Sequence, residues 1–170
     1  MAERRRLAMA ALAASVCAAV AATVGSAPTP RLVWNASASA PIGLYRTLPG
    51  APVRVGDLVI AKLPSRVAWL AARRHYLPLG VPLVKRVVAG AGSRVCAVGQ
   101  DVTIDGKAFV RRLAQDSRGR ALPAWSGCRT LQAGEVFLVM VKVRDSFDGR
   151  YFGPTAADDV IAKAVPIWAR

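Results

Sequence analysis

The sequence predicts a mainly β domain with one or two short helices, preceded by a separate N-terminal helical segment. Short β-prone runs bounded by Gly, Pro and Asp recur throughout residues 28–170, and only one stretch there has apolar residues at helical spacing. The first 27 residues contain an uncharged run of helical length. The remaining residues, about 140, are enough for one domain with its own hydrophobic core, and no internal repeat indicates a second.

The N-terminal segment has three consecutive arginines at residues 4–6, followed by an uncharged run from Leu7 to Ala27. As a helix this run would extend roughly 31 Å, close to the thickness of the bilayer core. We therefore expect residues 1–27 to form a cytoplasmic basic tip and a single transmembrane anchor in the inner membrane, oriented by the positive-inside rule. A cleavable signal peptide has the same basic start and small residues at its end, and stays open as an alternative. In both cases residues 28–170 are expected in the periplasm.

Two serines, Ser37 and Ser39, lie among alanines just before Pro41 and Gly43. Small neighbours leave a hydroxyl uncovered, proline favours an extended residue before it, and glycine permits close approach of the backbone. If the segment is extended, both serine side chains point to the same face. The stretch is either a polar loop that follows the N-terminal segment or the location of an exposed nucleophile.

The rest of the chain alternates short strands with turns. Gly56–Asp57 is expected to lead into a strand, and Asp105–Gly106 between two β-prone runs predicts a hairpin. Ser65 is expected to cap a short helix from Val67 to Tyr76, and residues 115–126 to form an exposed polar excursion. The further expected strands are Leu83 to Ala89, Arg94 to Val98, Val102 to Ile104, Lys107 to Arg111, Glu135 to Val143 and Val160 to Val165.

Lys85 lies within an expected strand, on the same face as Leu83 and Val87. Burial among apolar side chains lowers the pKa of a lysine, and a general base near neutral pH needs a pKa of about 7–8 instead of about 10.4. Such a shift costs about 4 kcal/mol, a large part of a domain stability of about 5–15 kcal/mol. The alternative is a lysine whose amine reaches solvent at the strand edge. Arg86 cannot be the base, because a guanidinium stays protonated.

Histidine and metal chemistry have little support in the sequence. The only histidine, His75, lies at the basic end of the expected helix, where the helix dipole favours a solvated cation. No Cys and His cluster has metal-ligand spacing, so we expect neither a metal nor a cofactor. A serine activated by a neutral lysine is a known alternative to a Ser-His-Asp triad, and Ser39 and Lys85 supply both groups.

The net charge of +14 belongs mostly to the expected domain, because residues 1–27 contribute only +2. The lysines and arginines are scattered, and no ladder of aromatic residues lies between them, so no nucleic-acid partner is expected. A domain that lies against an anionic membrane surface explains the charge at least as well.

Cys96 and Cys128 both lie in the part of the chain that we expect to be exported, where disulfides persist. Cys96 falls in an expected strand and Cys128 ends the polar excursion. A disulfide between them would therefore tie that excursion to the strand and close a loop of about 30 residues. The alternative is two unpaired thiols. Cys17 lies in the N-terminal apolar run, where it is expected to be a small apolar residue.

Four motifs in order resemble the boxes of the type I signal peptidases. They are Ser37–Pro41, Gly56–Val59, Lys85–Val88 and Ser146–Pro154, and Val160 to Val165 fits the last strand of that family. The form Ser-x-Pro-x-Gly-x-Tyr, from Ser39 to Tyr45, is more similar to the TraF-type conjugative transfer peptidase branch. The resemblance covers residues 32–168.

The resemblance implies that Ser39 is the nucleophile and Lys85 the general base. It implies that the Ser37 hydroxyl and the backbone N–H of Ser39 form the oxyanion hole. It further implies that Ser146 hydrogen-bonds the Lys85 amine. Asp148 and Arg150 would pair to support the site.

The sequence departs from the pattern of the family at three places. Ala40 stands where a methionine usually follows the nucleophile, and Gly149 stands where a serine usually separates the Asp from the Arg. Met140–Val143 occupies the position of an expected Gly-Asp-Asn-Arg run. These departures leave the Ser–Lys pair intact and affect the supporting roles of Ser146 and Asp148.

The family fold implied by this resemblance is an antiparallel β domain with an apolar face toward the membrane. Its groove binds an extended substrate and has small apolar pockets for small residues before the cut. We therefore expect a membrane-anchored serine endopeptidase at the outer face of the inner membrane. Its expected partners are an exported pilin-like or other transfer protein that carries a signal sequence, inner-membrane lipids, and other proteins of a transfer apparatus. The alternatives are a housekeeping signal peptidase and a non-catalytic basic scaffold of a transfer or secretion apparatus.

Overall fold

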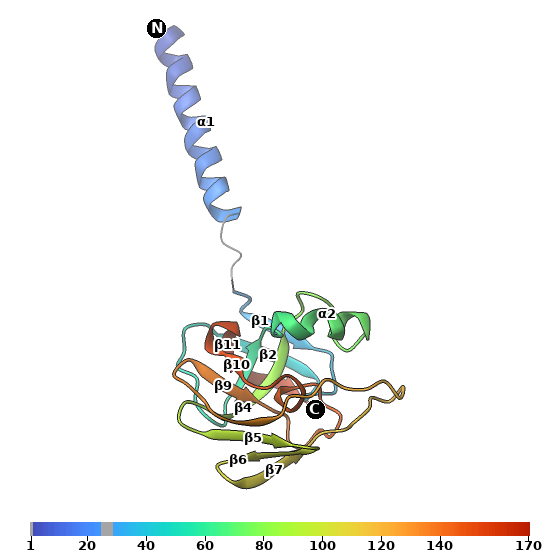
Figure 1. Cartoon of the computed structure of the whole chain (residues 1–170). Helices are drawn as coiled ribbons and strands as arrows, with labels where there is room; N and C mark the ends of the chain where they lie inside the picture. The colour runs from blue at the N-terminus through green and yellow to red at the C-terminus, as the bar shows by residue number, and fades with distance from the viewer. Residues whose placement is uncertain (1, 25–28) are drawn as a thin grey trace. The chain divides into compact units, whose positions relative to one another are not determined.

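The computed structural model describes residues 2–24 and 29–170. Helix α1, Ala2–Val24, belongs to an N-terminal unit, and a separate compact domain extends over Arg31–Arg170 (Figure 1). The domain boundary expected between residues 27 and 28 lies outside the described residues.

Helix α1 forms where the uncharged run predicts a helix. However, across residues 2–24 and 29–170 no helix is both long enough and apolar enough to cross a membrane. The expected transmembrane anchor is therefore not supported. Alanine dominates this segment, and alanine is the strongest helix former while contributing only a small apolar side chain. The end of the expected run, residues 25–27, lies outside the described part of the chain.

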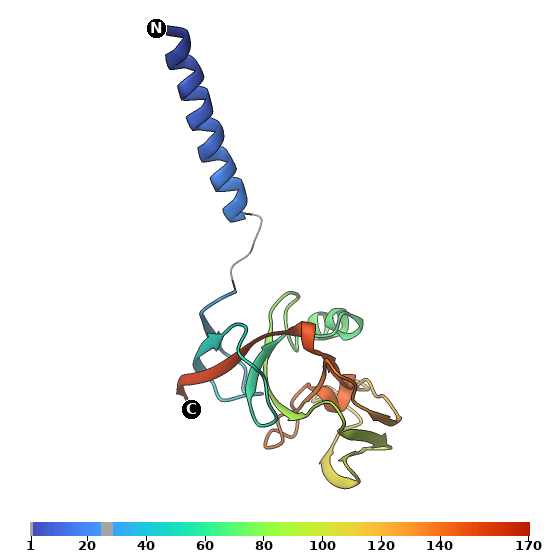
Figure 2. The same cartoon turned by 90° about the vertical axis from the view of Figure 1, so that its left-hand side faces the viewer.

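Two antiparallel sheets form the domain, so the predicted mainly β class is confirmed. The larger sheet has the strand order β1-β2-β11-β3-β4-β9-β10 and is strongly curved, with the long β11 running across it (Figure 2). Its strands are β1 (Leu32–Asn35), β2 (Gly43–Leu48), β3 (Leu58–Ala61), β4 (Leu83–Ala89), β9 (Glu135–Leu138), β10 (Thr155–Ala156) and β11 (Val160–Ala169).

The smaller sheet has the order β7-β6-β5-β8 and lies below the larger one in Figure 1. Its strands are β5 (Arg94–Val98), β6 (Asp101–Ile104), β7 (Lys107–Arg111) and β8 (Gly127–Thr130). The predicted hairpin at Asp105–Gly106 is confirmed: both residues have positive φ, of 50° and 76°, as a tight turn of this kind requires. Short helices α2 (Ser65–Arg73) and α3 (Gly149–Phe152) and the 3₁₀ turn η1 (Ala157–Asp159) complete the domain.

Strands β4, β5 and β7 begin and end at the residues expected from the sequence. Strand β9 ends at Leu138, five residues early, because the chain turns between Met140 and Val143 with an N–H···O distance of 3.1 Å. The expected Ser65 cap is wrong. Helix α2 is preceded by Pro64, whose carbonyl accepts the backbone N–H groups of Val67 and Ala68. Strands β1, β2, β8 and β10 and helix α3 were not expected.

Buried apolar side chains join these elements in three clusters. One lies between the larger sheet and helices α2 and α3, where Val67 and Phe152 contact the sheet residues Val59, Val87 and Leu138. A second joins the two sheets through Phe137 of β9 and three residues of the smaller sheet, Val95, Ala97 and Val102. The third lies under the β1–β2 connection and contains Ala40 and Tyr45.

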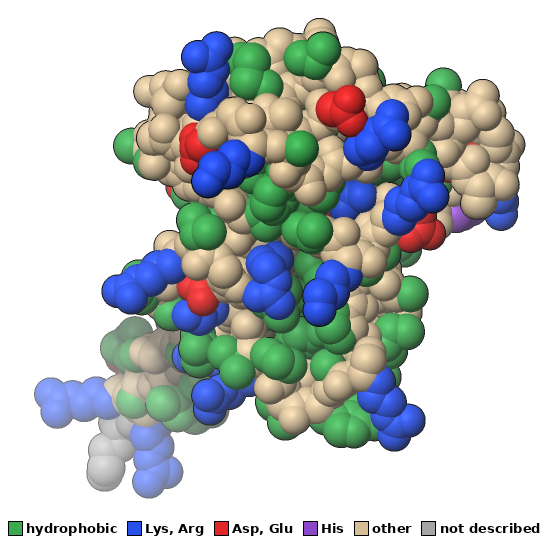
Figure 3. Space-filling model, turned by 90° about the horizontal axis from the view of Figure 1, so that it is seen from below, with side chains coloured by type: hydrophobic (Ala, Val, Ile, Leu, Met, Phe, Trp, Pro, Cys, Tyr) green, Lys and Arg blue, Asp and Glu red, His purple; other side chains and the backbone are tan. Residues whose placement is uncertain are grey.

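The basic side chains of the domain are dispersed. Figure 3 shows one face on which lysines and arginines are separated from one another by apolar and neutral groups. On that face the charge does not gather into a single stripe, in keeping with the scattered pattern of the sequence.

Candidate active site

The two serines lie on the connection between β1 and β2. This connection is a turn, so the extended conformation considered in the sequence analysis does not apply: the N–H of Ala40 donates to the carbonyl of Ser37 at 3.3 Å. The turn still brings the hydroxyls together: Ser37 Oγ donates to Ser39 Oγ at 3.0 Å, and the backbone N–H of Ser39 donates to Ser37 Oγ at 3.2 Å. The two expected oxyanion donors thus lie side by side and interact with each other.

Lys85 enters the same site from β4. Its side chain is 1% exposed, and its Nζ lies 2.8 Å from Ser39 Oγ and 2.9 Å from Ser146 Oγ. The alternative of a lysine reaching solvent at the strand edge is therefore wrong. Burial lowers the pKa of Lys85 from its ordinary value of 10.5 to about 8, against a smaller increase from Asp148 and with a further decrease from Arg150. At this pKa a substantial fraction of Lys85 is neutral in mildly alkaline solution.

Ser146 reaches Lys85 from the segment between β9 and α3, and Asp148 and Arg150 follow it there. All three side chains are almost fully buried. Arg150 donates from Nε to Asp148 Oδ1 at 2.8 Å and from Nη2 to Asp148 Oδ2 at 3.1 Å. The Asp148 carboxylate also accepts the backbone N–H of Met140 at 3.0 Å. The ion pair therefore links the end of the β9 segment to the start of α3 and fixes the chain that carries Ser146.

The packing explains two departures from the family pattern. At Gly149 a Cβ atom would lie 2.8 Å from the carbonyl oxygen of Leu138 and 2.9 Å from the ring of Phe137, so a side chain would require these groups to move. Ala40 is 2% exposed and packs in the same apolar cluster as Met140, which belongs to the segment that replaces the expected Gly-Asp-Asn-Arg run. The supporting contacts of Ser146 and Asp148 form despite these substitutions.

A cleft of about 340 Å³ opens beside Ser39 and Lys85. Most of its other walls are apolar, and they come from the segments just before and after α2, from β4, and from two loops. The lining residues away from the serines and lysine include Leu63, Tyr76, Leu77, Leu83, Leu113, Leu122 and Phe147. A groove of this chemistry suits an extended peptide with small or apolar side chains.

The excursion over residues 115–126 contributes to this cleft, which the sequence did not predict. Asp116 accepts the hydroxyl of Tyr76, the Nε of Arg120 at 2.7 Å, and the backbone N–H groups of Arg118 and Arg120 at 2.9 Å each. These contacts join the loop to the end of α2. Burial alone would raise the pKa of Asp116, but these hydrogen bonds lower it below its ordinary value. The sequence signal that could have indicated this contribution to the cleft is the pair of leucines at positions 113 and 122, which flank the polar residues.

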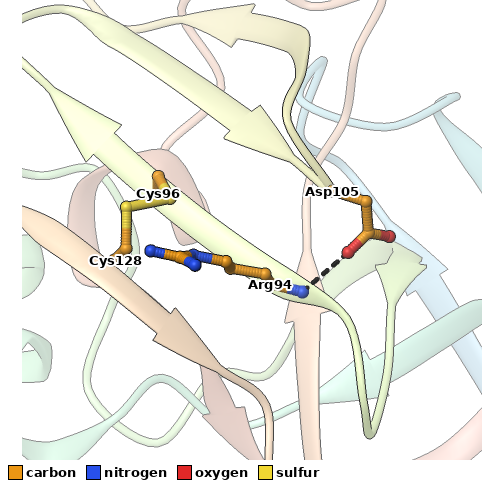
Figure 4. Close-up of a disulfide and its surroundings, with 4 residues drawn as sticks. All are labelled: Arg94, Cys96, Asp105 and Cys128. Atoms are coloured by element: carbon orange, nitrogen blue, oxygen red, sulfur yellow. Dashed lines mark hydrogen bonds between the residues drawn. A yellow bond between two sulfur atoms is a disulfide. The ribbon is translucent and has the colours of Figure 1, made fainter.

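The expected Cys96–Cys128 disulfide is present and joins adjacent strands β5 and β8, in which the two cysteines lie opposite each other (Figure 4). Nearby, the Asp105 carboxylate accepts the backbone N–H of Arg94 at 2.7 Å. The disulfide belongs to the smaller sheet, whereas Ser39 and Lys85 belong to the larger one. His75, the only histidine, is exposed in the turn after α2, as expected of a solvated residue.

The sequence profile of the signal peptidase family, peptidase S26, matches residues 4–169. The chain belongs to this family. It is 36% identical over 140 residues to a probable conjugal transfer protein TraF from Sinorhizobium fredii, a match that covers 76% of this chain and 73% of that protein. It is 33% identical over 160 residues to a plasmid transfer protein TraF from Escherichia coli, covering 88% of each. These likenesses assign the chain to the TraF-type branch of the signal peptidases.

A signal peptidase I from Enterococcus faecalis resembles the structure with a TM-score of 0.37 and 18% identity, covering 68% of this chain and 98% of that one.

Proposed function

We propose that this signal peptidase family member is a serine endopeptidase, with Ser39 as nucleophile and Lys85 as general base. The observation that carries the proposal is the contact of 2.8 Å between Ser39 Oγ and the buried Nζ of Lys85. A lysine that is nearly inaccessible to solvent and has a pKa of about 8 suits proton abstraction from a serine.

In the first step, neutral Lys85 accepts the hydroxyl proton of Ser39 while Oγ attacks the scissile carbonyl carbon. The C–N bond then breaks, the new amine takes the proton from Lys85, and an acyl-enzyme ester remains. Water, activated by Lys85 in the same way, cleaves this ester. The Ser37 hydroxyl and the backbone N–H of Ser39 stabilise the oxyanion in both steps, and Ser146 orients the lysine amine through its contact of 2.9 Å.

The proposed substrate is an exported, pilin-like or other conjugative transfer protein that carries a signal sequence. The TraF relatives support a role in conjugation by their names, and the apolar cleft supports an extended segment with small side chains before the cut. We place the reaction in the periplasm, because disulfides such as Cys96–Cys128 persist in oxidising compartments.

Membrane lipids are a further proposed partner of the domain. Trp34 and Trp168 are each at least half exposed and stack on each other with ring centroids 5.8 Å apart, and Ile42 and Ile167 are also exposed. Tryptophan side chains are enriched where protein meets the lipid headgroups. We expect Trp34→Ala to weaken co-sedimentation of residues 29–170 with anionic vesicles. Equal binding by this variant and the unchanged domain would remove lipids from the proposal.

The test of the dyad is cleavage of a co-expressed pilin-like precursor, followed by mass spectrometry. Ser39→Ala should abolish processing. Lys85→Arg should be as inactive as Lys85→Ala, since a guanidinium keeps its proton. Ser37→Ala should lose about 10²–10³ in rate, because it removes one oxyanion donor among several.

Activity of the unchanged enzyme should rise with pH through about 8 as Lys85 becomes neutral. Normal processing by both Ser39→Ala and Lys85→Arg would refute the peptidase and favour a scaffold.

A further inference from the structure

Asn35, the only asparagine in the sequence, is the last residue of β1 and is 8% exposed. Its side-chain Nδ2 lies within hydrogen-bond distance of three carbonyl oxygens: Ser37 at 2.9 Å, Ala40 at 3.1 Å and Pro41 at 3.0 Å. Its Oδ1 accepts the backbone N–H of Ser37 at 3.2 Å. One amide side chain therefore contacts the chain on both sides of Ser39.

These contacts define the shape of the turn that presents the nucleophile. The carbonyl of Ser37 also closes the turn through Ala40, and the carbonyl of Pro41 also accepts the hydroxyl of Tyr45 at 2.6 Å. By contrast, the carbonyl of Ala40 is buried against Asn35. Without the Asn35 amide, the turn loses a side chain that contacts both its beginning and its end. A buried carbonyl without a donor is costly, so the chain would move to satisfy it.

We propose that Asn35 is a positioning residue for catalysis, which fixes Ser39 Oγ at its contact distance from Lys85 Nζ. The inference rests on the proposed roles of Ser39 and Lys85. Lys85 is fixed independently by its strand and by Ser146, so a shift of the turn changes the distance between the two catalytic atoms. A misplacement of about 1 Å is enough to reduce an enzymatic rate by about 10²-fold.

The experiment compares Asn35→Ala with Asn35→Asp on an internally quenched signal-sequence peptide with alanine at the first and third positions before the cut. We expect kcat to fall by about 10²-fold in Asn35→Ala, with KM within about threefold and the pH midpoint of the rate unchanged. Asn35→Asp keeps the size of the side chain and its Oδ1 acceptor. Its carboxylate cannot donate to three carbonyl oxygens, so we expect a loss at least as large.

Two further variants separate positioning from general stability. Gln132→Ala removes another amide side chain that donates to a backbone carbonyl, that of Thr130, far along the chain, and should leave kcat unchanged. Tyr45→Phe removes only the hydroxyl contact to Pro41 and should cost less than Asn35→Ala. Denaturant unfolding of each variant establishes that rates are compared among folded proteins.

The inference is overturned if Asn35→Asp, folded, retains kcat within threefold of the unchanged enzyme. It is equally overturned if the loss appears in KM alone or moves the pH midpoint, because the residue would then act on the substrate or on Lys85. If the proposed roles of Ser39 and Lys85 are themselves wrong, the outcome is different, because Ser39→Ala and Lys85→Arg would then still cut the peptide. Full activity of Asn35→Asp beside inactive Ser39→Ala would reject the role of Asn35 alone.

Discussion

The seven-stranded sheet buries charged and polar side chains, whereas the four-stranded sheet exposes many of its own. Lys85 on β4 and the Asp148–Arg150 pair beside β9 are at most 1% exposed. In the smaller sheet, the Arg111–Asp101 pair has side chains 73% and 63% exposed, and all four residues of β8 are exposed. A buried ion pair therefore stabilises the surroundings of the first sheet, while a disulfide joins two strands of the second.

This difference in burial indicates how substitutions in each sheet should affect stability and activity. The proposed chemistry requires a lysine with a lowered pKa, and burial is the largest cause of that decrease here. The site therefore depends on the sheet whose burial is most complete. A change in the larger sheet should alter both stability and activity, and a change in the smaller sheet should alter stability alone.

The largest effect on stability is expected for Asp148→Ala. It leaves the guanidinium of Arg150 buried without a counterion, which costs about 3–5 kcal/mol. The control is Asp101→Ala, which removes the exposed pair with Arg111 and should cost about 0–1 kcal/mol. Urea unfolding measures both. Equal costs for the two variants would remove the distinction between the sheets.

A second effect concerns the disulfide of the smaller sheet. Replacing both Cys96 and Cys128 with alanine should lower the free energy of unfolding by about 3–4 kcal/mol in the chain-entropy model, for a sequence separation of 32 residues. At a temperature where the variant is folded, kcat/KM should stay within about twofold, because neither cysteine lines the cleft described above.

Cys17→Ala on α1 is the control for this change, since that thiol is free and exposed. It should alter neither stability nor activity. A folded Cys96→Ala, Cys128→Ala double variant with a large loss of kcat would show that the smaller sheet helps to shape the site.

Local patterns in the sequence were sufficient to predict several strands of both sheets, but not β1 or β2. β-branched residues predicted β4, with burial of Lys85 left open, and Asp105–Gly106 predicted the β6–β7 hairpin. Strand β8 could not be predicted in this way, because Gly127–Thr130 has no buried residue and forms a strand only by pairing with β5. The four-residue helix α3 likewise depends on Asp148, which caps it through the backbone N–H of Arg150.

The contacts of the candidate site also divide into those that the sequence indicated and those that depend on the fold. Motif order alone indicated Ser39, Lys85 and Ser146, and the structure brings their side chains into contact. The turn geometry at Ser37 and Ser39 was missed, because it depends on the buried amide of Asn35. The wall formed by residues 115–126 was missed because Asp116 and its partners are polar and resemble an exposed loop until Tyr76 is brought to them by the fold.

The smallest expected effect is on the pH dependence of the free energy of unfolding, and its measurement tests the burial of Lys85 without an activity assay. Its pKa is about 8 in the folded state and about 10.4 in the unfolded chain. Below about 8 both states carry the proton, and the folded state bears the full cost of a buried charge. Between these values only the unfolded state binds the proton, so the free energy of unfolding should increase with pH, by up to about 3 kcal/mol in total.

Lys85→Met removes this titrating group and should remove the increase between about pH 8 and 10.4. Lys142→Met, which replaces an exposed lysine, should retain it. The raised pKa values of the buried phenols Tyr45 and Tyr151 affect all three proteins alike, so the difference between the curves isolates Lys85. If the curves of Lys85→Met and Lys142→Met stay parallel, Lys85 has no lowered pKa in the folded protein. The larger sheet would then lack the buried neutral base on which the proposed chemistry depends.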